Sequence, residues 1–172
     1  VPSKTLNIAL AGTGVGKSLF MCHCASAYLT QGLNVLYVTL EMAEERIAER
    51  IDANLLDATM EDLHEMPKTV YENRMNKLQK KTHGKLIIKE YPTASAHSGH
   101  FRALLNELSL KKSFKPDVIF IDYLNICASS RFKGGNISSY FYVKAIAEEL
   151  RGLAVEYDVP IFSATQTTRT GF

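Results

Sequence analysis

Short apolar runs alternate along the chain with longer segments in which apolar residues recur every three or four positions. The runs are rich in β-branched and aromatic residues, and their length is typical of the buried strands of a parallel sheet. We therefore predict five strands, at Leu6–Ala11, Val35–Leu40, Leu86–Tyr91, Val118–Tyr123 and Pro160–Thr165.

The segments between these runs have helical periodicity. Residues 17–31 are apolar nearly all round, whereas Ile47, Ile51 and Leu55 form one face of a charged segment. We predict helices over 17–31, 43–56, 60–83, 100–112 and 139–157, with Pro67 dividing the third segment into two helices. This alternation predicts an α/β fold, a doubly wound and mainly parallel sheet with helices on both faces.

The first predicted strand leads into AGTGVGKS, residues 11–18, which matches the phosphate-loop pattern G-x-x-x-x-G-K-[ST] except at Ala11. Lys17 would reach the β- and γ-phosphates of a nucleotide, and Ser18 would ligate Mg²⁺. Ala11 is compatible with this role if its φ and ψ are ordinary. The alternative is a glycine-rich turn that binds nothing. The predicted nucleotide-binding residues are Gly12, Thr13, Gly14, Val15, Gly16, Lys17 and Ser18.

Polar side chains follow three other strands, and ligands of such sheets bind beyond the carboxyl ends of the strands. Glu41 would activate an attacking water, or it is an acid in the first turn of the next helix. Asp122 ends an apolar run, as a carboxylate of the Mg²⁺ shell does, or it is a chance acid. Gln166 would sense the γ-phosphate, or it is an exposed polar residue.

Composition narrows the class of protein. A chain of 172 residues with 46% hydrophobic and 22% charged residues is one ordinary globular domain. The net charge of +2 gives no global signal for nucleic acid, so contact with DNA requires a local basic segment. Three cysteines without a framework spacing indicate a reducing compartment. Without a signal peptide or a long apolar run, we expect a cytoplasmic protein that does not contact a membrane.

The stretches AGTGVGKS, TLEM, VIFIDYL and SATQ, in this order, resemble the RecA-type motor domain of DnaB-type replicative helicases. The stretches VLYVTLEMAEERIAERIDANLLD and VKAIAEELRGLAVE make the chain most similar to the helicases of large tailed phages, which act in the host cytoplasm. The resemblance covers essentially the whole chain. It implies a RecA-like P-loop NTPase that uses ATP, or another NTP, with Mg²⁺.

The resemblance also implies roles for single residues. Glu41 matches the catalytic glutamate, Asp122 the aspartate that holds Mg²⁺ through water, and Gln166 the γ-phosphate sensor. In this family the segment corresponding to 128–140 helps to line a DNA channel, and here it carries Arg131 and Lys133. Arg169 lies just past the sensor, where the family often has a basic residue, and its role stays open.

The function implied is that of an ATP-hydrolysing motor in a hexameric ring, which moves along single-stranded DNA and unwinds the duplex. The implied partners are single-stranded DNA, further copies of the protein, primase and other replisome proteins. We expect residues 1–172 to be the ATPase core of a longer protein and nearly inactive alone, because the family's amino-terminal domain, linker and arginine finger lie outside them. The alternatives are a recombinase-like or clock-like ATPase, a nucleotide-switched binding module and a small-molecule kinase, for which no arginine-rich lid is present.

Overall fold

The core of the molecule is a five-stranded parallel sheet, seen in a computed structural model that describes residues 2–12, 16–81, 84–130 and 139–167. The strand order is β1-β5-β4-β2-β3, and every neighbouring pair is parallel. The strands are β1 (Leu6–Gly12), β2 (Val35–Thr39), β3 (Leu86–Glu90), β4 (Val118–Asp122) and β5 (Ile161–Thr167).

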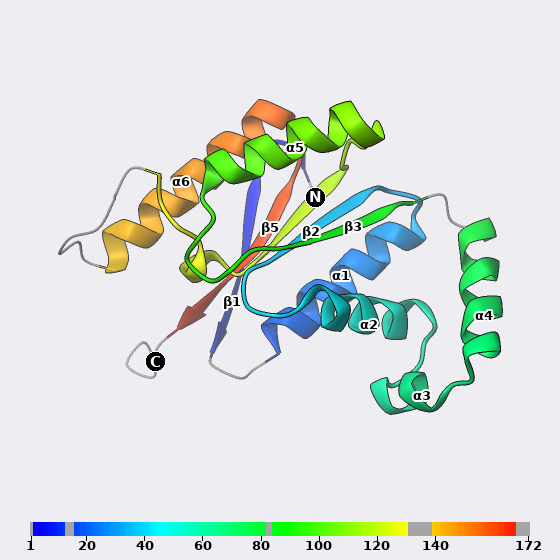
Figure 1. Cartoon of the computed structure of the whole chain (residues 1–172). Helices are drawn as coiled ribbons and strands as arrows, with labels where there is room; N and C mark the ends of the chain where they lie inside the picture. Colours follow the sequence, from blue (N-terminus) through cyan, green and yellow to red (C-terminus); the bar gives the residue numbers. More distant parts are fainter. Residues whose placement is uncertain (1, 13–15, 82–83, 131–138, 168–172) are drawn as a thin grey trace.

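Helices cover both faces of this sheet, which confirms the predicted doubly wound α/β architecture. Figure 1 shows α5 and α6 on one face and α1 and α2 on the other. The helices are α1 (Lys17–Thr30), α2 (Glu44–Leu55), α3 (Met60–Glu65), α4 (Lys68–Lys81), α5 (Ser98–Lys112) and α6 (Ser139–Tyr157), and a 3₁₀ turn, η1, spans Leu124–Ile126. In the described parts of the chain, no helix combines the length and the hydrophobicity needed to cross a bilayer.

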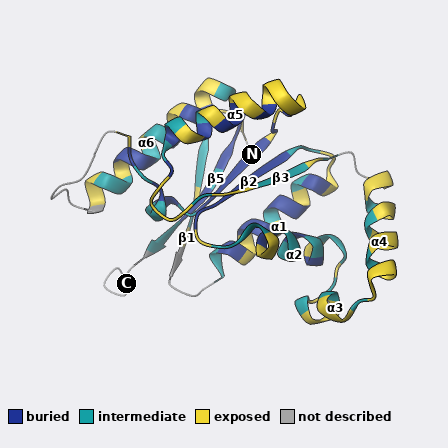
Figure 2. Cartoon of the chain, viewed as in Figure 1, coloured by how far each residue is buried: buried dark blue, intermediate teal, exposed yellow. Residues whose placement is uncertain are grey.

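The side chains of each strand alternate between the two faces of the sheet, and this alternation produces two hydrophobic cores. On β2, Leu36 and Val38 pack into the cluster beneath α5 and α6, whereas Val35 and Tyr37 pack into the cluster beneath α1 and α2. Successive side chains of a strand point to opposite faces, so a strand buried on both sides must be apolar throughout. Figure 2 shows the central strands as the most buried part of the molecule.

The helices α3 and α4 form an excursion beside β3 (Figure 1). The side chains of Thr59 and Asp62 form a capping box that begins α3, and Pro67 precedes α4, so the predicted division of this segment is confirmed. No residue of α4 is buried. Tyr71 joins α4 to α2 by donating a 2.6 Å hydrogen bond to Asp52, and this bond is the main cause that raises the pKa of Tyr71 to about 12.

Several bounds of the predicted elements shift by one or two residues, and one of these shifts bears on the site. The predicted fifth strand ends at Thr165, but Gln166 lies inside β5, because pairing with β1 continues as far as Gly12 opposite Thr167. The prediction that the first helix packs against the sheet is confirmed, since Met21, Ala25 and Leu29 of α1 are buried there, whereas Leu19 and Phe20 are each 52% exposed.

Candidate functional site

The predicted phosphate loop connects the end of β1 to the start of α1. Gly16 is the N-cap residue of α1, with φ 79° and ψ 31°, a left-handed conformation in which a side chain would be strained. Ala11 lies in β1, opposite Gln166 on β5, so its backbone is extended and needs no glycine. Residues 13–15 of the predicted loop lie outside the described residues.

Lys17 and Ser18 occupy the first turn of α1. Ser18 is buried, and the Lys17 side chain is only 14% exposed. The Nζ atom of Lys17 lies 3.8 Å from Oε2 of Glu41 and 4.1 Å from the ring centroid of Tyr123. The carboxylate and the face of the aromatic ring thus hold the Lys17 side chain at the carboxyl edge of the sheet, where a polyphosphate would meet it.

Glu41 is placed by a tight turn at the end of β2. The hydroxyl of Thr39 donates to the carbonyl oxygen of Met42 at 2.8 Å and accepts from the N–H of Met42 at 3.2 Å, which closes the turn around Glu41. The Leu40 N–H donates to the carbonyl oxygen of Asp122 at 3.1 Å. The helix α2 begins only at Glu44, so the interpretation of Glu41 as an acid in the first turn of a helix is wrong.

Asp122 is a buried carboxylate at the end of β4, 2% exposed. Its Oδ2 accepts a 2.8 Å hydrogen bond from the Tyr37 hydroxyl, whereas no described residue donates to its buried Oδ1. A buried carboxylate oxygen without a donor is unfavourable unless a cation or an ordered water completes it. The free oxygen of Asp122 therefore fits Mg²⁺ with its bound water.

No protein-only metal site is present in the described ranges, because no three His, Cys, Asp or Glu side chains cluster together there.

Tyr37 also contacts the first helix. Its hydroxyl lies 3.8 Å from the thiol of Cys22 on α1, so one buried chain connects α1, β2 and β4. Burial raises the pKa of Tyr37 well above its ordinary value, and the Asp122 charge raises it further. Burial likewise raises the pKa of Cys22 to about 11. Both groups therefore stay protonated at neutral pH, and Tyr37 remains a donor to Asp122.

Gln166 lies on β5 between the strand of the phosphate loop and the strand of Asp122. Its backbone N–H donates to Oδ1 of Asn125 at 3.1 Å, and the Thr165 hydroxyl donates to the same oxygen at 3.0 Å. The expected constellation of Lys17, Ser18, Glu41, Asp122 and Gln166 thus stands along one edge of the sheet.

The described start of the predicted DNA segment is anchored on α6. The Ser129 N–H donates to the Tyr142 hydroxyl at 3.0 Å, and the Ser129 hydroxyl donates to Glu149 at 3.1 Å. Arg131, Lys133 and Arg169 lie outside the described residues.

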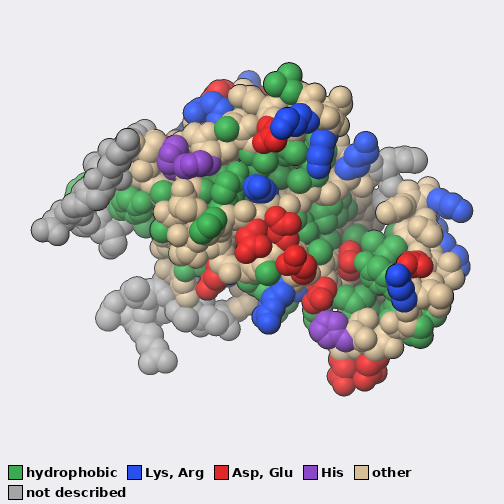
Figure 3. Space-filling model, viewed as in Figure 1, with side chains coloured by type: hydrophobic (Ala, Val, Ile, Leu, Met, Phe, Trp, Pro, Cys, Tyr) green, Lys and Arg blue, Asp and Glu red, His purple; other side chains and the backbone are tan. Residues whose placement is uncertain are grey.

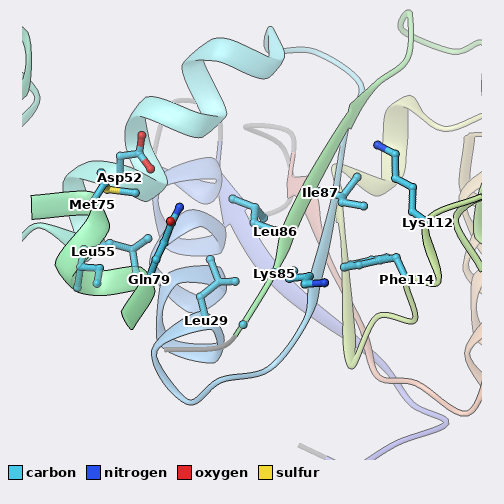
Figure 4. Close-up of a pocket in the computed structure, with 12 residues that line it drawn as sticks. Leu29, Asp52, Leu55, Met75, Gln79, Lys85, Leu86, Ile87, Lys112 and Phe114 are labelled. Atoms are coloured by element: carbon cyan, nitrogen blue, oxygen red, sulfur yellow. The ribbon is translucent and has the colours of Figure 1, made fainter. Parts of the chain in front are cut away.

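A cavity of about 710 Å³ lies away from this edge, near the amino end of β3. Figure 4 shows Met75 and Gln79 of α4 on one side of it and Leu86 and Ile87 of β3 on the other. The residues of the predicted nucleotide site do not line this cavity, so the two features are separate.

Sequence reasoning missed Tyr37, Tyr123 and Asn125. Tyr123 follows Asp122 directly, and its position at the strand end was the available signal. Tyr37 stands inside an apolar run and has the pattern of a core residue, and Asn125 lies in the short turn η1, for which the sequence has no periodic pattern.

Known proteins resemble this chain over nearly its full length. A model of the DnaB-like helicase C-terminal domain family matches residues 2–171. The "DnaB-like replicative helicase" of Enterobacteria phage T4 is 50% identical over 165 residues, which cover 94% of this chain and 35% of that protein. The "Probable plasmid replicative DNA helicase" of Chlamydia psittaci is 28% identical over 164 residues, 94% of this chain and 34% of that protein.

Solved structures share the fold at low identity. A DnaB-like replicative helicase, described with its interactions with primase, has a TM-score of 0.74 at 16% identity, over 98% of this chain and 40% of that one. A second solved structure, described as an ATPase domain, has the same TM-score and identity, over 99% of this chain and 60% of that one. These neighbours confirm the RecA-like class of the α/β fold.

The chain spans about a third of the length of the curated relatives that it matches. Since the family model covers residues 2–171 and the phage relative is half identical across them, the chain belongs to the family of DnaB-like helicase C-terminal domains.

Proposed function

We propose that residues 1–172 are the ATPase core of a longer replicative DNA helicase. The observation that carries the proposal is the approach of Lys17 Nζ to Glu41 Oε2, 3.8 Å, at the edge where Asp122 presents a buried oxygen without a described partner. A cation for phosphate, a carboxylate for water and a carboxylate for metal thus stand at one edge. Family membership supports the use of a nucleotide.

Each residue has a chemical role in this proposal. The amides of the loop 11–18 and Lys17 hold the β- and γ-phosphates, and Ser18 and Asp122 hold Mg²⁺, Asp122 through water. Mg²⁺ neutralises charge on the phosphate oxygens. Glu41 is 57% exposed and accepts the proton of the attacking water, and Gln166 donates to the γ-phosphate. An arginine of a neighbouring subunit completes the charge stabilisation.

Single-stranded DNA is the proposed track, bound through Arg131 and Lys133 in the segment 128–140. The described surface has mixed charge, and Figure 3 shows basic side chains over α4 and acidic ones over α3. A local basic segment is therefore needed for the DNA backbone. The proposal includes ring assembly, primase and other replisome proteins as partners, and the host-cell cytoplasm as the location. The structural neighbour described with primase supports the primase partner.

The complete protein with Mg²⁺ and ATP on forked DNA is the test of this function. We expect ATP-dependent release of one strand, abolished in Glu41→Gln and retained in Glu45→Gln, which changes an exposed acid of α2. Strand exchange without fork unwinding would favour the recombinase-like alternative. Hydrolysis that DNA does not stimulate would contradict the motor proposal.

We expect residues 1–172 alone to show negligible hydrolysis. The arginine that we propose to come from a neighbouring subunit raises the rate by about 10³–10⁵-fold.

A further inference from the structure

Asn125 connects two parts of the site that the proposed mechanism leaves separate. Its Oδ1 accepts a hydrogen bond from the Thr165 hydroxyl at 3.0 Å and another from the Gln166 N–H at 3.1 Å. Asn125 belongs to η1, three residues after Asp122, whereas Thr165 and Gln166 belong to β5. One amide oxygen thus uses both its lone pairs to join η1 to the strand of the proposed γ-phosphate sensor.

The chain that continues from η1 is fixed on its other side. The Ala128 N–H donates to the carbonyl oxygen of Ala96 at 2.7 Å, and Ser129 bonds to Tyr142 and Glu149 of α6. Residues 124–130 are therefore held at both ends by hydrogen bonds. This stretch leads directly into the segment proposed to contact DNA, so the anchors at Asn125, Ala128 and Ser129 together set where that segment begins.

Both donors to Asn125 lie on β5, the strand that carries the proposed γ-phosphate sensor. Gln166 presents its backbone N–H to Asn125, which leaves its side-chain amide for the γ-phosphate. A shift of the β5 backbone at Thr165 and Gln166 on loss of the γ-phosphate would therefore either carry Asn125 with it or break these hydrogen bonds. Ser163, three residues before Gln166, donates its hydroxyl to the carbonyl oxygen of Ile121 at 2.7 Å, so β5 and β4 are fixed to each other below this point.

We propose that Asn125 is a positioning residue that couples the γ-phosphate sensor to the DNA segment. The inference rests on the proposed function, in which Gln166 senses the nucleotide and residues 128–140 contact DNA. Coupling of this kind is a free energy shared by two sites, so the nucleotide state changes DNA affinity and DNA changes hydrolysis. Asn125 does not touch the nucleotide in this scheme.

The test uses the complete protein with three substitutions and a control. Asn125→Ala removes the shared acceptor, Asn125→Asp keeps an acceptor oxygen at the same position, and Thr165→Val removes one donor at nearly constant volume. Asn106→Ala is the matched control, because Oδ1 of Asn106 accepts a hydrogen bond from Tyr157, between α5 and α6. The readouts are kcat and KM for ATP with and without single-stranded DNA, DNA affinity with ADP and with a non-hydrolysable ATP analogue, and thermal melting.

We expect Asn125→Ala to keep the KM for ATP and to lose at least about fivefold of the DNA stimulation of kcat, the lower end of ordinary coupling between sites. The difference in DNA affinity between the two nucleotide states should shrink with it. Thr165→Val should show a smaller loss, Asn125→Asp should restore most of the stimulation, and Asn106→Ala should match the parent.

Stimulation in Asn125→Ala within about twofold of the parent would overturn the inference and leave the proposed function intact. A loss that Asn125→Asp does not restore, together with a lower melting temperature, would assign Asn125 a purely structural role and overturn it as well. A parent protein whose hydrolysis does not respond to DNA would instead overturn the proposed function itself, and the inference with it.

Discussion

The hydroxyl of Tyr37 donates a 2.8 Å hydrogen bond to Oδ2 of Asp122, and both side chains are buried between the sheet and α1. Tyr37 pairs in register with Phe120, two residues before Asp122, so its ring stacks on Phe120 while its hydroxyl reaches the carboxylate. The hydrogen bond occupies one oxygen of Asp122 and fixes the other for the proposed metal. A residue with the pattern of a core position thus orients a residue of the site.

Replacing Tyr37 by phenylalanine should weaken the use of Mg²⁺. Tyr37→Phe removes the donor and leaves a buried carboxylate without it, which costs about 1–3 kcal/mol in the free energy of unfolding. In the complete protein, half-maximal ATP hydrolysis should need a higher Mg²⁺ concentration. Tyr28→Phe is the control, since Tyr28 packs by its ring against Phe120 and Phe162 in the same core. A Mg²⁺ titration identical to that of the parent would contradict the role of Tyr37.

Stability should fall at alkaline pH through the buried thiol. The pKa of Cys22 rises from 9.0, the ordinary value for a cysteine thiol, to about 11 in the folded chain, mainly through burial. The folded state holds its proton more tightly, so this stabilisation is complete below pH 9 and is lost between pH 9 and about 11. The loss corresponds to about 3 kcal/mol.

Urea unfolding at about pH 7.5 and across that range measures this loss. Cys22→Ser, which does not titrate there, should show a shallower decline, with a remainder from Tyr37 and Cys127, whose pKa values burial also raises. An unchanged decline in Cys22→Ser would show that other groups account for the effect.

Glu41 should act in chemistry and not in binding. In the complete protein, Glu41→Gln should keep the affinity for Mg·ATP and lose roughly 10²-fold or more of its turnover, the usual effect of removing a general base. Steady-state hydrolysis beside equilibrium binding of a fluorescent ATP analogue separates the two quantities. Glu45→Gln controls for the loss of a negative charge near α2. Normal turnover in Glu41→Gln would rule out the assignment.

Arg131 and Lys133 should contact the DNA backbone without reading bases. Neutralising both in the complete protein should weaken single-strand binding about equally for all sequences. The dependence of affinity on salt should also become less steep, because fewer counterions are released. Neutralising Lys80 and Lys81 at the end of α4 removes the same charge elsewhere and is the control. Equal effects from both pairs would show a non-specific loss of positive charge.

The edge of the site was predictable from sequence for a simple reason. Parallel strands end at one edge, so Lys17, Glu41 and Asp122, which each follow or end an apolar run, had to lie near one another. The departure at Ala11 was predictable as harmless, because the position before the loop is still extended strand.

Other features could not be predicted from the sequence, because they depend on the register of the strands and on the turns. The predicted fifth strand ends too early. No glycine or proline directly follows Thr165 to mark the end of the strand, so only the pairing of β5 with β1 fixes its length. The contact of Tyr37 depends on which residue of β4 lies opposite, and alternation alone does not specify that. The bond from Gln166 to Asn125 joins residues 41 positions apart through a 3₁₀ turn that leaves no periodic trace in the sequence.

Calorimetric titration of Mg·ATP into the protein and into Lys17→Ala tests the central claim, that the edge beside Lys17 is the nucleotide site. We predict saturable binding to the parent and no measurable binding to Lys17→Ala, with an unchanged melting temperature, because the contacts that are lost, with Glu41 and Tyr123, lie at the edge of the sheet. Lys80→Ala should bind as the parent does. Binding of the same affinity in Lys17→Ala would contradict the account.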